Sequence, residues 1–236
     1  GDILRFAITN KPAWASFDVS TGTLSGTPDN SAVGTYSQIQ ISVSDGTLSA
    51  SLPAFTLIVL NVNDTPVISG VAPTTVAEDT AYSFVPQAND PDLGTVLVFN
   101  ISNKPVWASF NQATGALTGT PTNSSVGTFS NIVISVTDGV VTATLPAFNI
   151  QVTNVNDAPV ISGNPATSVQ GRANYSFVPT VTDDDAGDTL VFSISNKPSW
   201  ASFNSTTGAL TGTPQNTQAG VYSNIVISVS DGQVLV

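Results

Sequence analysis

The chain has no cysteine, no histidine and no methionine, and only five of its 236 residues are lysine or arginine. Without cysteine, neither a disulfide framework nor thiol chemistry is available. Without histidine, the chain lacks the commonest general base and the commonest transition-metal ligand. With five cationic side chains and a formal charge of −11, it cannot neutralise a phosphate backbone, so nucleic acid is excluded as a partner.

Long apolar runs and helical periodicity are also missing. No stretch reaches the roughly 20 apolar residues that span a bilayer, and no signal peptide or lipidation motif is visible. We therefore expect no membrane insertion in this segment. The acidic balance favours solubility and the binding of cations.

What the chain has is a repeat with a constant interval of 93 residues. Trp14, Trp107 and Trp200 each lie in an Asn-Lys-Pro-x-Trp-Ala-Ser-Phe block. The repeat predicts three units at 1–64, 65–157 and 158–236, of which the first lacks its opening strands and the last its closing strand. Because both ends fall inside a repeat, we expect the chain to be a window from a longer array.

Apolar residues alternate along short segments of each copy, and turn residues separate these segments. In the middle copy the predicted strands are Pro66–Val71 with Thr75–Val76, Ala81–Val85, Val96–Ile101, Trp107–Phe110, Ala116–Thr118, and stripes at 132–136 and 148–152. This pattern predicts an all-β fold, a linear array of seven-stranded Greek-key sandwiches. The recurring tryptophan is interpreted as a core anchor in preference to a carbohydrate-stacking platform.

The acidic residues of the complete copy are few, and all lie at strand ends or in loops. They are Glu78, Asp79, Asp90, Asp92, Asp138 and Asp157. In the predicted sandwich these loops gather at the two poles of a repeat, where like charges would repel one another. Calcium, which takes six to eight oxygen ligands, would remove that repulsion, whereas zinc is disfavoured without His or Cys. The alternative is that these residues are ordinary turn formers.

The order of these motifs resembles a cadherin repeat. The motifs are Glu78-Asp79-Thr80, Asp90-Pro91-Asp92, Val136-Thr137-Asp138-Gly139 and Asn154-Val155-Asn156-Asp157, with Val181–Gly187 in the third copy. The Trp-Ala-Ser-Phe and Thr-Gly-x-Leu-x-Gly-Thr-Pro stretches look like the dystroglycan-type cadherin-like, or "putative Ig", repeats of large bacterial surface proteins. The resemblance implies immunoglobulin- and cadherin-like sandwiches with Ca²⁺ bridging successive repeats.

By position, the resemblance implies a set of cation ligands at each junction. The first junction would use Asn61, Asn63, Asp64, Asp90, Asp92 and Asp138; the second would use Glu78, Asn154, Asn156, Asp157, Asp183, Asp185 and Asp231, with the Val155 carbonyl. Three departures weaken the pattern. The usual Asp-Arg-Glu motif is replaced around Asp29, Thr122 and Gln215, the first linker acid is Asn61 or Asn154, and the third copy has Gly171-Arg172 where the second has Glu78-Asp79.

These observations predict a structural protein and not an enzyme: a calcium-stiffened stalk or adhesive repeat region, extracellular or on the cell surface. Its expected partners are calcium and the neighbouring repeats of the same chain, with other copies of itself or surface polysaccharide as further candidates. Two alternatives stay open. The repeats could be carbohydrate-binding accessory modules of an extracellular hydrolase, or subunits of a self-assembling fibre completed by strand exchange.

Overall fold

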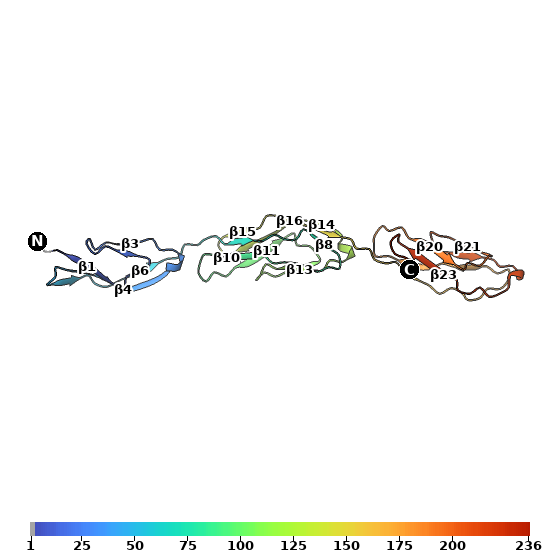
Figure 1. Cartoon of the computed structure of the whole chain (residues 1–236), viewed down its shortest axis with the longest axis horizontal. Helices are drawn as coiled ribbons and strands as arrows, with labels where there is room; N and C mark the ends of the chain where they lie inside the picture. The colour runs from blue at the N-terminus through green and yellow to red at the C-terminus, as the bar shows by residue number, and fades with distance from the viewer. Residues whose placement is uncertain (1–2) are drawn as a thin grey trace. The chain divides into compact units, whose positions relative to one another are not determined.

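The structure is a computed structural model that describes residues 3–236; residues 1–2 of the first predicted repeat lie outside the described part. Strands make up the regular structure, and the described residues hold no helix beyond three short 3₁₀ turns (Figure 1). Two compact units divide the chain, one comprising residues up to Pro73 with Ser83–Thr118 and Ser130–Asn149, the other Thr74–Tyr82, Gly119–Phe129 and Ile150–Val236. The middle repeat contributes to both units.

The first repeat has one main sheet built around a long strand. Its elements are β1 (Arg5–Thr9), β2 (Ser16–Phe17), β3 (Leu24–Ser25), the 3₁₀ turn η1 (Asn30–Ala32), β4 (Gly34–Ser44), β5 (Ser49–Ser51) and β6 (Phe55–Val59). The strand β4 pairs antiparallel with β1, β5 and β6, while β2 and β3 form a hairpin. Ile39 of β4 is fully buried.

The middle repeat has ten strand segments. They are β7 (Val67–Ser69), β8 (Thr75–Ala77), β9 (Tyr82–Phe84), β10 (Gln87–Asn89), β11 (Val98–Ser102), β12 (Ala108–Phe110), β13 (Leu117–Gly119), β14 (Gly127–Thr137), β15 (Thr142–Thr144) and β16 (Phe148–Thr153), with η2 (Asn123–Ser125) before β14. One sheet has the order β11-β14-β16-β8, with β15 also on β14; β12-β13-β9 and β10-β7 form the others. The pairing of β16 with β8 is parallel, and the pairing of β11 with β14 is antiparallel.

The ten segments include the first strand, split as predicted, and two strands that the sequence pattern did not predict, β10 and β15. A proline lies at each of these three breaks. Pro73 separates β7 from β8, Pro86 separates β9 from β10, and Pro146 separates β15 from β16. Proline has no N–H to donate to a ladder, so a strand is interrupted where one occurs. The interruption lets the two halves pair differently: β9 lies beside β13, while β10 lies beside β7.

The third repeat repeats this plan with fewer strands. Its elements are β17 (Val160–Ser162), β18 (Tyr175–Phe177), β19 (Thr180–Thr182), β20 (Val191–Ser195), β21 (Ala201–Phe203), β22 (Leu210–Gly212), η3 (Asn216–Gln218) and β23 (Val226–Ser230). The strand pairs are β17 with β19, β18 and β21 with β22, and β20 with β23. The prediction of all-β immunoglobulin- and cadherin-like sandwiches in tandem is confirmed, and the predicted boundaries fall in the coil after β6 and after β16.

The alternating stripes form the core as predicted. Ile132, Ile134 and Val136 of β14 are each fully buried, as are Ile150 and Val152 of β16. Burial of such side chains contributes about 1.5–3 kcal/mol each, which makes these stripes the main source of stability.

The recurring tryptophans pack against tyrosines of their own repeats. The Trp14 and Tyr36 rings lie 5.9 Å apart edge to face, and the Trp200 and Tyr222 rings lie 6.1 Å apart in the same geometry. All three tryptophans, including Trp107, which was predicted to be largely buried, are half-buried. The ring contacts of Trp14 and Trp200 lie within their own repeats, which favours the core-anchor interpretation over an exposed carbohydrate platform.

Candidate metal centres

The strand ends gather the acidic and amide side chains at each repeat junction. The linkers Asn61–Asp64 and Asn154–Asp157 follow β6 and β16, and the two Asp-x-Asp loops follow β10 and β19. Asp138 and Asp231 directly follow β14 and β23. The turns η1 and η2 begin with Asn30 and Asn123, so an additional amide stands at each junction.

At the first junction, linker donors meet carboxylates of the middle repeat. The Asp64 backbone N–H donates to Asp92 Oδ2 at 2.8 Å, and Asn63 Nδ2 donates to Asp138 Oδ2 at 2.8 Å. Asn30 Nδ2 donates to Asp64 Oδ2 at 2.6 Å and, more weakly, to Asp92 Oδ1 at 3.4 Å. Asp92 is 7% exposed, so a carboxylate at this junction is held out of water.

The second junction repeats the pattern with one more contact. The Asp157 N–H donates to Asp185 Oδ2 at 2.7 Å, and Asn156 Nδ2 donates to Asp231 Oδ2 at 2.8 Å. Asp185 Oδ1 accepts from Asn154 Nδ2 at 2.8 Å and Asn123 Nδ2 at 3.1 Å. These donors lower the pKa of Asp185 below its usual 3.8, the Asp157 N–H first and the Asn154 amide second. The pKa of Asp231 is lowered chiefly by the Val234 N–H and then by Asn156.

Glu78 reaches the second junction from the middle repeat. It follows β8, is only 1% exposed, and its Oε1 accepts from the Val155 N–H of the linker at 2.7 Å. Its other oxygen, Oε2, is shielded from solvent and has no hydrogen-bond partner. A buried carboxylate oxygen without a partner is costly, and such groups in proteins are usually paired or bound to a metal.

Two further carboxylates share this unsatisfied state. In each Asp-x-Asp loop the first aspartate accepts the N–H of the second through Oδ1: Asp90 from Asp92 at 2.8 Å, and Asp183 from Asp185 at 3.0 Å. The Oδ2 atoms of Asp90 and Asp183 are shielded and unpartnered. Each junction therefore holds an oxygen ligand with no donor to satisfy it.

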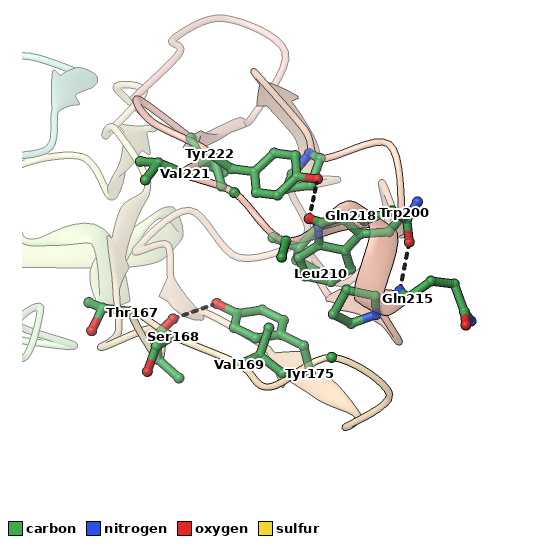
Figure 2. A pocket seen from close by; sticks show the side chains of 17 residues that line it. Thr167, Ser168, Val169, Tyr175, Trp200, Leu210, Gln215, Gln218, Val221 and Tyr222 are labelled. Carbon is green, nitrogen blue, oxygen red and sulfur yellow. Dashed lines mark hydrogen bonds between the residues drawn. The ribbon is translucent and has the colours of Figure 1, made fainter.

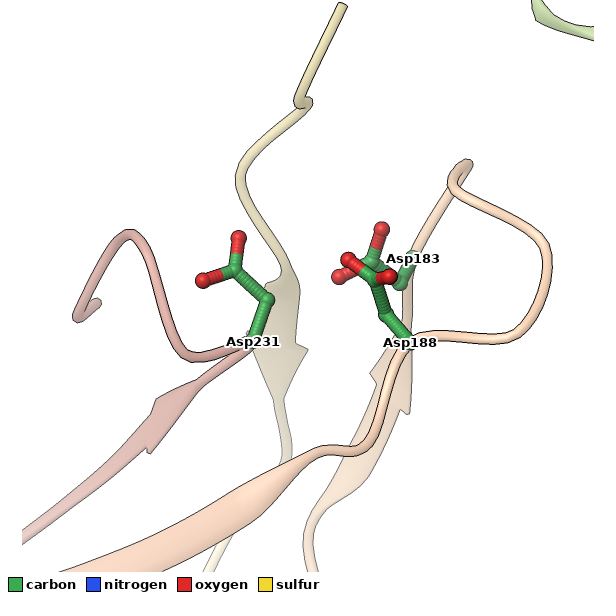
Figure 3. Close-up of side chains that lie close together, drawn as sticks. All are labelled: Asp183, Asp188 and Asp231. Carbon is green, nitrogen blue, oxygen red and sulfur yellow. The ribbon is translucent and has the colours of Figure 1, made fainter. Parts of the chain in front are cut away.

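A three-carboxylate group stands out at the second junction. Asp183, Asp188 and Asp231 each present a carboxylate oxygen, and these oxygens lie within 4.8 Å of one another (Figure 3). The pKa of Asp188 is raised by desolvation first and then by repulsion from Asp185, Asp183 and Asp231. A divalent cation would remove that repulsion.

The structure brings most of the residues predicted as ligands together at the junctions, and it places three further polar residues beside them that sequence reasoning missed. The additions are Asn30, Asn123 and Asp188; a signal for the first two was available, since Asn30 and Asn123 keep the 93-residue interval. Asn61 is exposed and takes no part in the hydrogen bonds of its junction, whereas its counterpart Asn154 binds Asp185. Asp157 contributes its N–H, and its carboxylate has no recorded hydrogen bond among the described residues.

The donor set fits a hard cation. It consists of carboxylate and amide side chains with no histidine nitrogen or cysteine sulfur, which suits calcium or magnesium and not zinc. The asparagines now turn Nδ2 toward carboxylates, and a half-turn of each amide would present Oδ1 to a cation instead. Residues of two successive repeats and their linker would hold it together.

A groove in the third repeat is the other candidate site. It has a volume of about 360 Å³ and is lined in part by Val169, Tyr175, Trp200, Tyr222 and Ile225 (Figure 2). In the middle repeat β14 pairs with β16 and Ile132 is fully buried; in the third repeat no strand of the described chain takes the place of β16, and the matching Ile225 is 36% exposed.

The fold and these junctions define a class: tandem immunoglobulin-like β-sandwich repeats, a fold that is typically non-enzymatic. The chain belongs to the Putative Ig domain family, which matches residues 1–60, 65–153 and 158–235. No curated protein sequence matches the chain. Within the described residues, no helix has the length and apolar character needed to cross a bilayer.

Solved structures similar to the chain include cadherin ectodomains. Mouse cadherin-23 EC22-24 is 18% identical with a TM-score of 0.48, covering 99% of this chain and 83% of that one. The protocadherin GammaB4 extracellular domain is 19% identical with a TM-score of 0.46, covering 99% and 43%. An endo-fucoidan hydrolase, MfFcnA4 of glycoside hydrolase family 107, is 25% identical with a TM-score of 0.36, and the chain spans only 37% of its length. At these TM-scores the likeness says nothing about activity.

Proposed function

We propose that this chain is part of a calcium-stiffened stalk or adhesive repeat region of an extracellular or surface-attached protein. The observation that carries the proposal is Glu78, a 1% exposed carboxylate of the middle repeat with one unpartnered oxygen. It is bound to a linker whose Asn154, Asn156 and Asp157 bind carboxylates of the third repeat. A cation bound here takes ligands from both repeats, so it restricts their relative motion.

The physical effect of the cation follows from charge. Without it, the carboxylates of Asp183, Asp185, Asp188 and Asp231 repel one another. With it, the carboxylates share a positive charge, and the angle between repeats is restricted because the ligands come from both sides. Length and stiffness are what tandem repeats of one fold supply, and an extracellular setting provides the millimolar calcium that weak module sites use.

Small-angle scattering tests the stiffening. The chain in calcium should give a narrower distribution of long interatomic distances than the chain in chelator. The variant Asp185→Asn should reduce this response while each repeat stays folded, because the side chain lies in a loop outside the core stripes. Asp18→Asn is a matched control, since Asp18 is exposed and its carboxylate accepts from Ser20 within the turn between β2 and β3. A distribution unchanged by calcium would contradict the stalk mechanism.

A further inference from the structure

Each repeat contains one Asp-Gly pair in the turn that follows a core strand. The pairs are Asp45-Gly46, Asp138-Gly139 and Asp231-Gly232, which directly follow β4, β14 and β23. The glycine φ angles are +100°, +96° and +100°, a left-handed region that glycine adopts without strain. The aspartate is half-buried and the glycine exposed in every pair. The three turns therefore share one backbone conformation and a similar access to water.

An Asp-Gly pair can rearrange without an enzyme, because glycine has no side chain to keep its nitrogen away from the aspartate Cγ. The nitrogen bonds to Cγ, whose hydroxyl leaves with the proton of that nitrogen, so one water is released and a succinimide ring forms. Water then reopens the ring. Cleavage of the Cγ–N bond restores aspartate, whereas cleavage of the backbone C–N bond leaves isoaspartate, in which the chain runs through the side-chain carboxyl. The first step requires the carboxyl group to rotate toward the glycine nitrogen.

One set of hydrogen bonds opposes this rotation in all three repeats. The aspartate Oδ1 accepts from the N–H groups two and three residues further along, at 2.8 and 2.7 Å for Asp45, 2.7 and 2.6 Å for Asp138, and 2.6 Å from both donors for Asp231. The glycine N–H donates to the hydroxyl of the Ser or Thr before the aspartate, at 3.1, 3.0 and 3.0 Å. Because these contacts match, they give the three pairs no reason to differ in reactivity.

The second carboxylate oxygen distinguishes the pairs. Asn63 Nδ2 donates to Asp138 Oδ2 at 2.8 Å, and Asn156 Nδ2 donates to Asp231 Oδ2 at 2.8 Å. Each asparagine also donates to the carbonyl of the residue after it, at 2.9 Å, which fixes the amide. Among residues 3–236, no side-chain amide donates to Asp45. Asp138 and Asp231 are thus held through both oxygens, and Asp45 through one.

We propose that Asp45-Gly46 is a site of spontaneous isoaspartate formation, and that Asn63 and Asn156 protect Asp138 and Asp231 from the same modification. The asparagines are positioning residues, because they hold each carboxylate in its turn. Rotation of a held carboxylate breaks one more hydrogen bond than rotation of Asp45 does, and a hydrogen bond to a charged group corresponds to a rate difference of about tenfold. No bound cation is needed for this protection.

Incubation of the whole chain at neutral pH in chelator, which removes any bound cation, tests the proposal. Peptide mapping by mass spectrometry, with electron-transfer fragmentation to distinguish isoaspartate from aspartate, measures all three pairs in one sample. Isoaspartate should accumulate at Asp45 about tenfold faster than at Asp138 or Asp231. Asn63→Ala should raise the rate at Asp138 about tenfold and leave the rates at the other two pairs unchanged.

Asn61→Ala is the matched control, since Asn61 is an exposed asparagine of the same linker and should leave all three rates unchanged when replaced. No isoaspartate at Asp45, or equal rates at the three pairs of the unmodified chain, would overturn the proposal. An unchanged rate at Asp138 in Asn63→Ala would do the same. If Asn63→Ala raised all three rates, the variant would be unfolded, and Asn156→Ala would decide, because it should raise the rate at Asp231 alone.

Discussion

Glu78 and Val155 lie 77 residues apart in sequence and are joined by a hydrogen bond of 2.7 Å from the Val155 N–H to Glu78 Oε1. The contact holds the linker against the end of β8, and the adjacent β8 residues pair in parallel with β16. It leaves Glu78 Oε2 shielded and unpartnered. The hydrogen bond thus fixes the position of the linker relative to the glutamate.

The variant Glu78→Gln should separate calcium binding from folding. Calcium at about a hundredfold excess over its dissociation constant adds about 2.7 kcal/mol to the free energy of unfolding, and the variant should lose most of this gain. In chelator its stability should change by less than about 1 kcal/mol, because the amide oxygen still accepts from Val155. Calorimetry with and without chelator measures both quantities. Asp79→Asn, an exposed neighbouring change, should keep the calcium response.

Magnesium should substitute poorly for calcium. Its octahedral shell is compact, at about 2.0–2.1 Å, and it releases water reluctantly, whereas these ligands come from several loops with varied spacing. The melting temperature should therefore rise less in magnesium than in calcium at equal concentration. Equal shifts in both would indicate general charge screening in place of a coordinated ion.

Acid should lower the stability of the folded chain, because it protonates junction carboxylates that accept hydrogen bonds from N–H groups. Hydrogen bonds lower the pKa of Asp138, Asp185 and Asp231 in the folded chain, chiefly from the backbone N–H groups of Val141, Asp157 and Val234 respectively. A carboxylate whose pKa is lower in the folded chain stabilises the fold at pH values above its unfolded pKa, which is near 3.8. This contribution to stability is lost as the pH falls through the folded pKa. Stability in chelator should therefore hold from neutral pH to about pH 4 and fall below it. A chemical-denaturation series across pH checks this.

Ionisation of Asp188 should have the opposite effect on stability. Its folded pKa is raised, by desolvation first and by the neighbouring aspartates next, so its ionised form destabilises the folded chain without a cation. In chelator at neutral pH, Asp188→Asn should melt at a higher temperature than the parent. The difference should shrink as the pH falls below the unfolded value, where both side chains are neutral. A difference independent of pH would contradict the electrostatic origin.

Gly115 should resist substitution because the side chains of its own repeat surround it. Its φ is +70°, and a Cβ there would stand 2.6 Å from Phe99 Cδ1 and 2.7 Å from Pro86 Cγ. Gly115→Ala should cost about 1–3 kcal/mol for overpacking and about 1–2 kcal/mol for the left-handed backbone. Gly94→Ala, with φ +83° and open space, should cost the backbone part alone. Equilibrium denaturation of the two variants would show equal losses if the contact with Phe99 were unimportant.

Burial should decide what truncation costs at the matched isoleucines Ile132 and Ile225. Ile132 is fully buried, so Ile132→Ala should cost about 2–5 kcal/mol. Ile225 is 36% exposed, so Ile225→Ala should cost less than about 1 kcal/mol. Thermal melts of the two variants compare these losses directly. Equal losses at the two positions would contradict the difference in burial.

Local pattern was enough to predict the repeat and most of the strands, although it missed β10 and β15. The alternation of Ile132, Ile134 and Val136 places them on one face of a strand, since successive side chains point to opposite sides, and all three are buried. The split first strand was predicted at the right place, around Pro73, because the loss of an N–H is a property of the residue itself. The further breaks at Pro86 and Pro146 carry the same signal.

The sequence could predict only some of the residues that meet at each junction. Sequence order places an aspartate at a strand end, but which strand ends meet depends on the ladders between distant segments. The pairing of β20 with β23 brings Asp188 beside Asp231, which no local pattern indicates. The same holds for Asn30 and Asn123, whose 3₁₀ turns direct their amides to carboxylates 62 residues further along the chain.

The sequence by itself determined the all-β class, the interval of the repeat and the oxygen-rich chemistry of the loops, because these depend on residue type and local spacing. The tertiary structure alone decided which oxygens are buried without partners and which asparagine of a matched pair is engaged. Asn61 stays in solvent while Asn154 binds Asp185, although both occupy the same position in the repeat. The reason is that hydrogen bonding and desolvation depend on neighbours from other strands, and packing, not local sequence, brings those neighbours together.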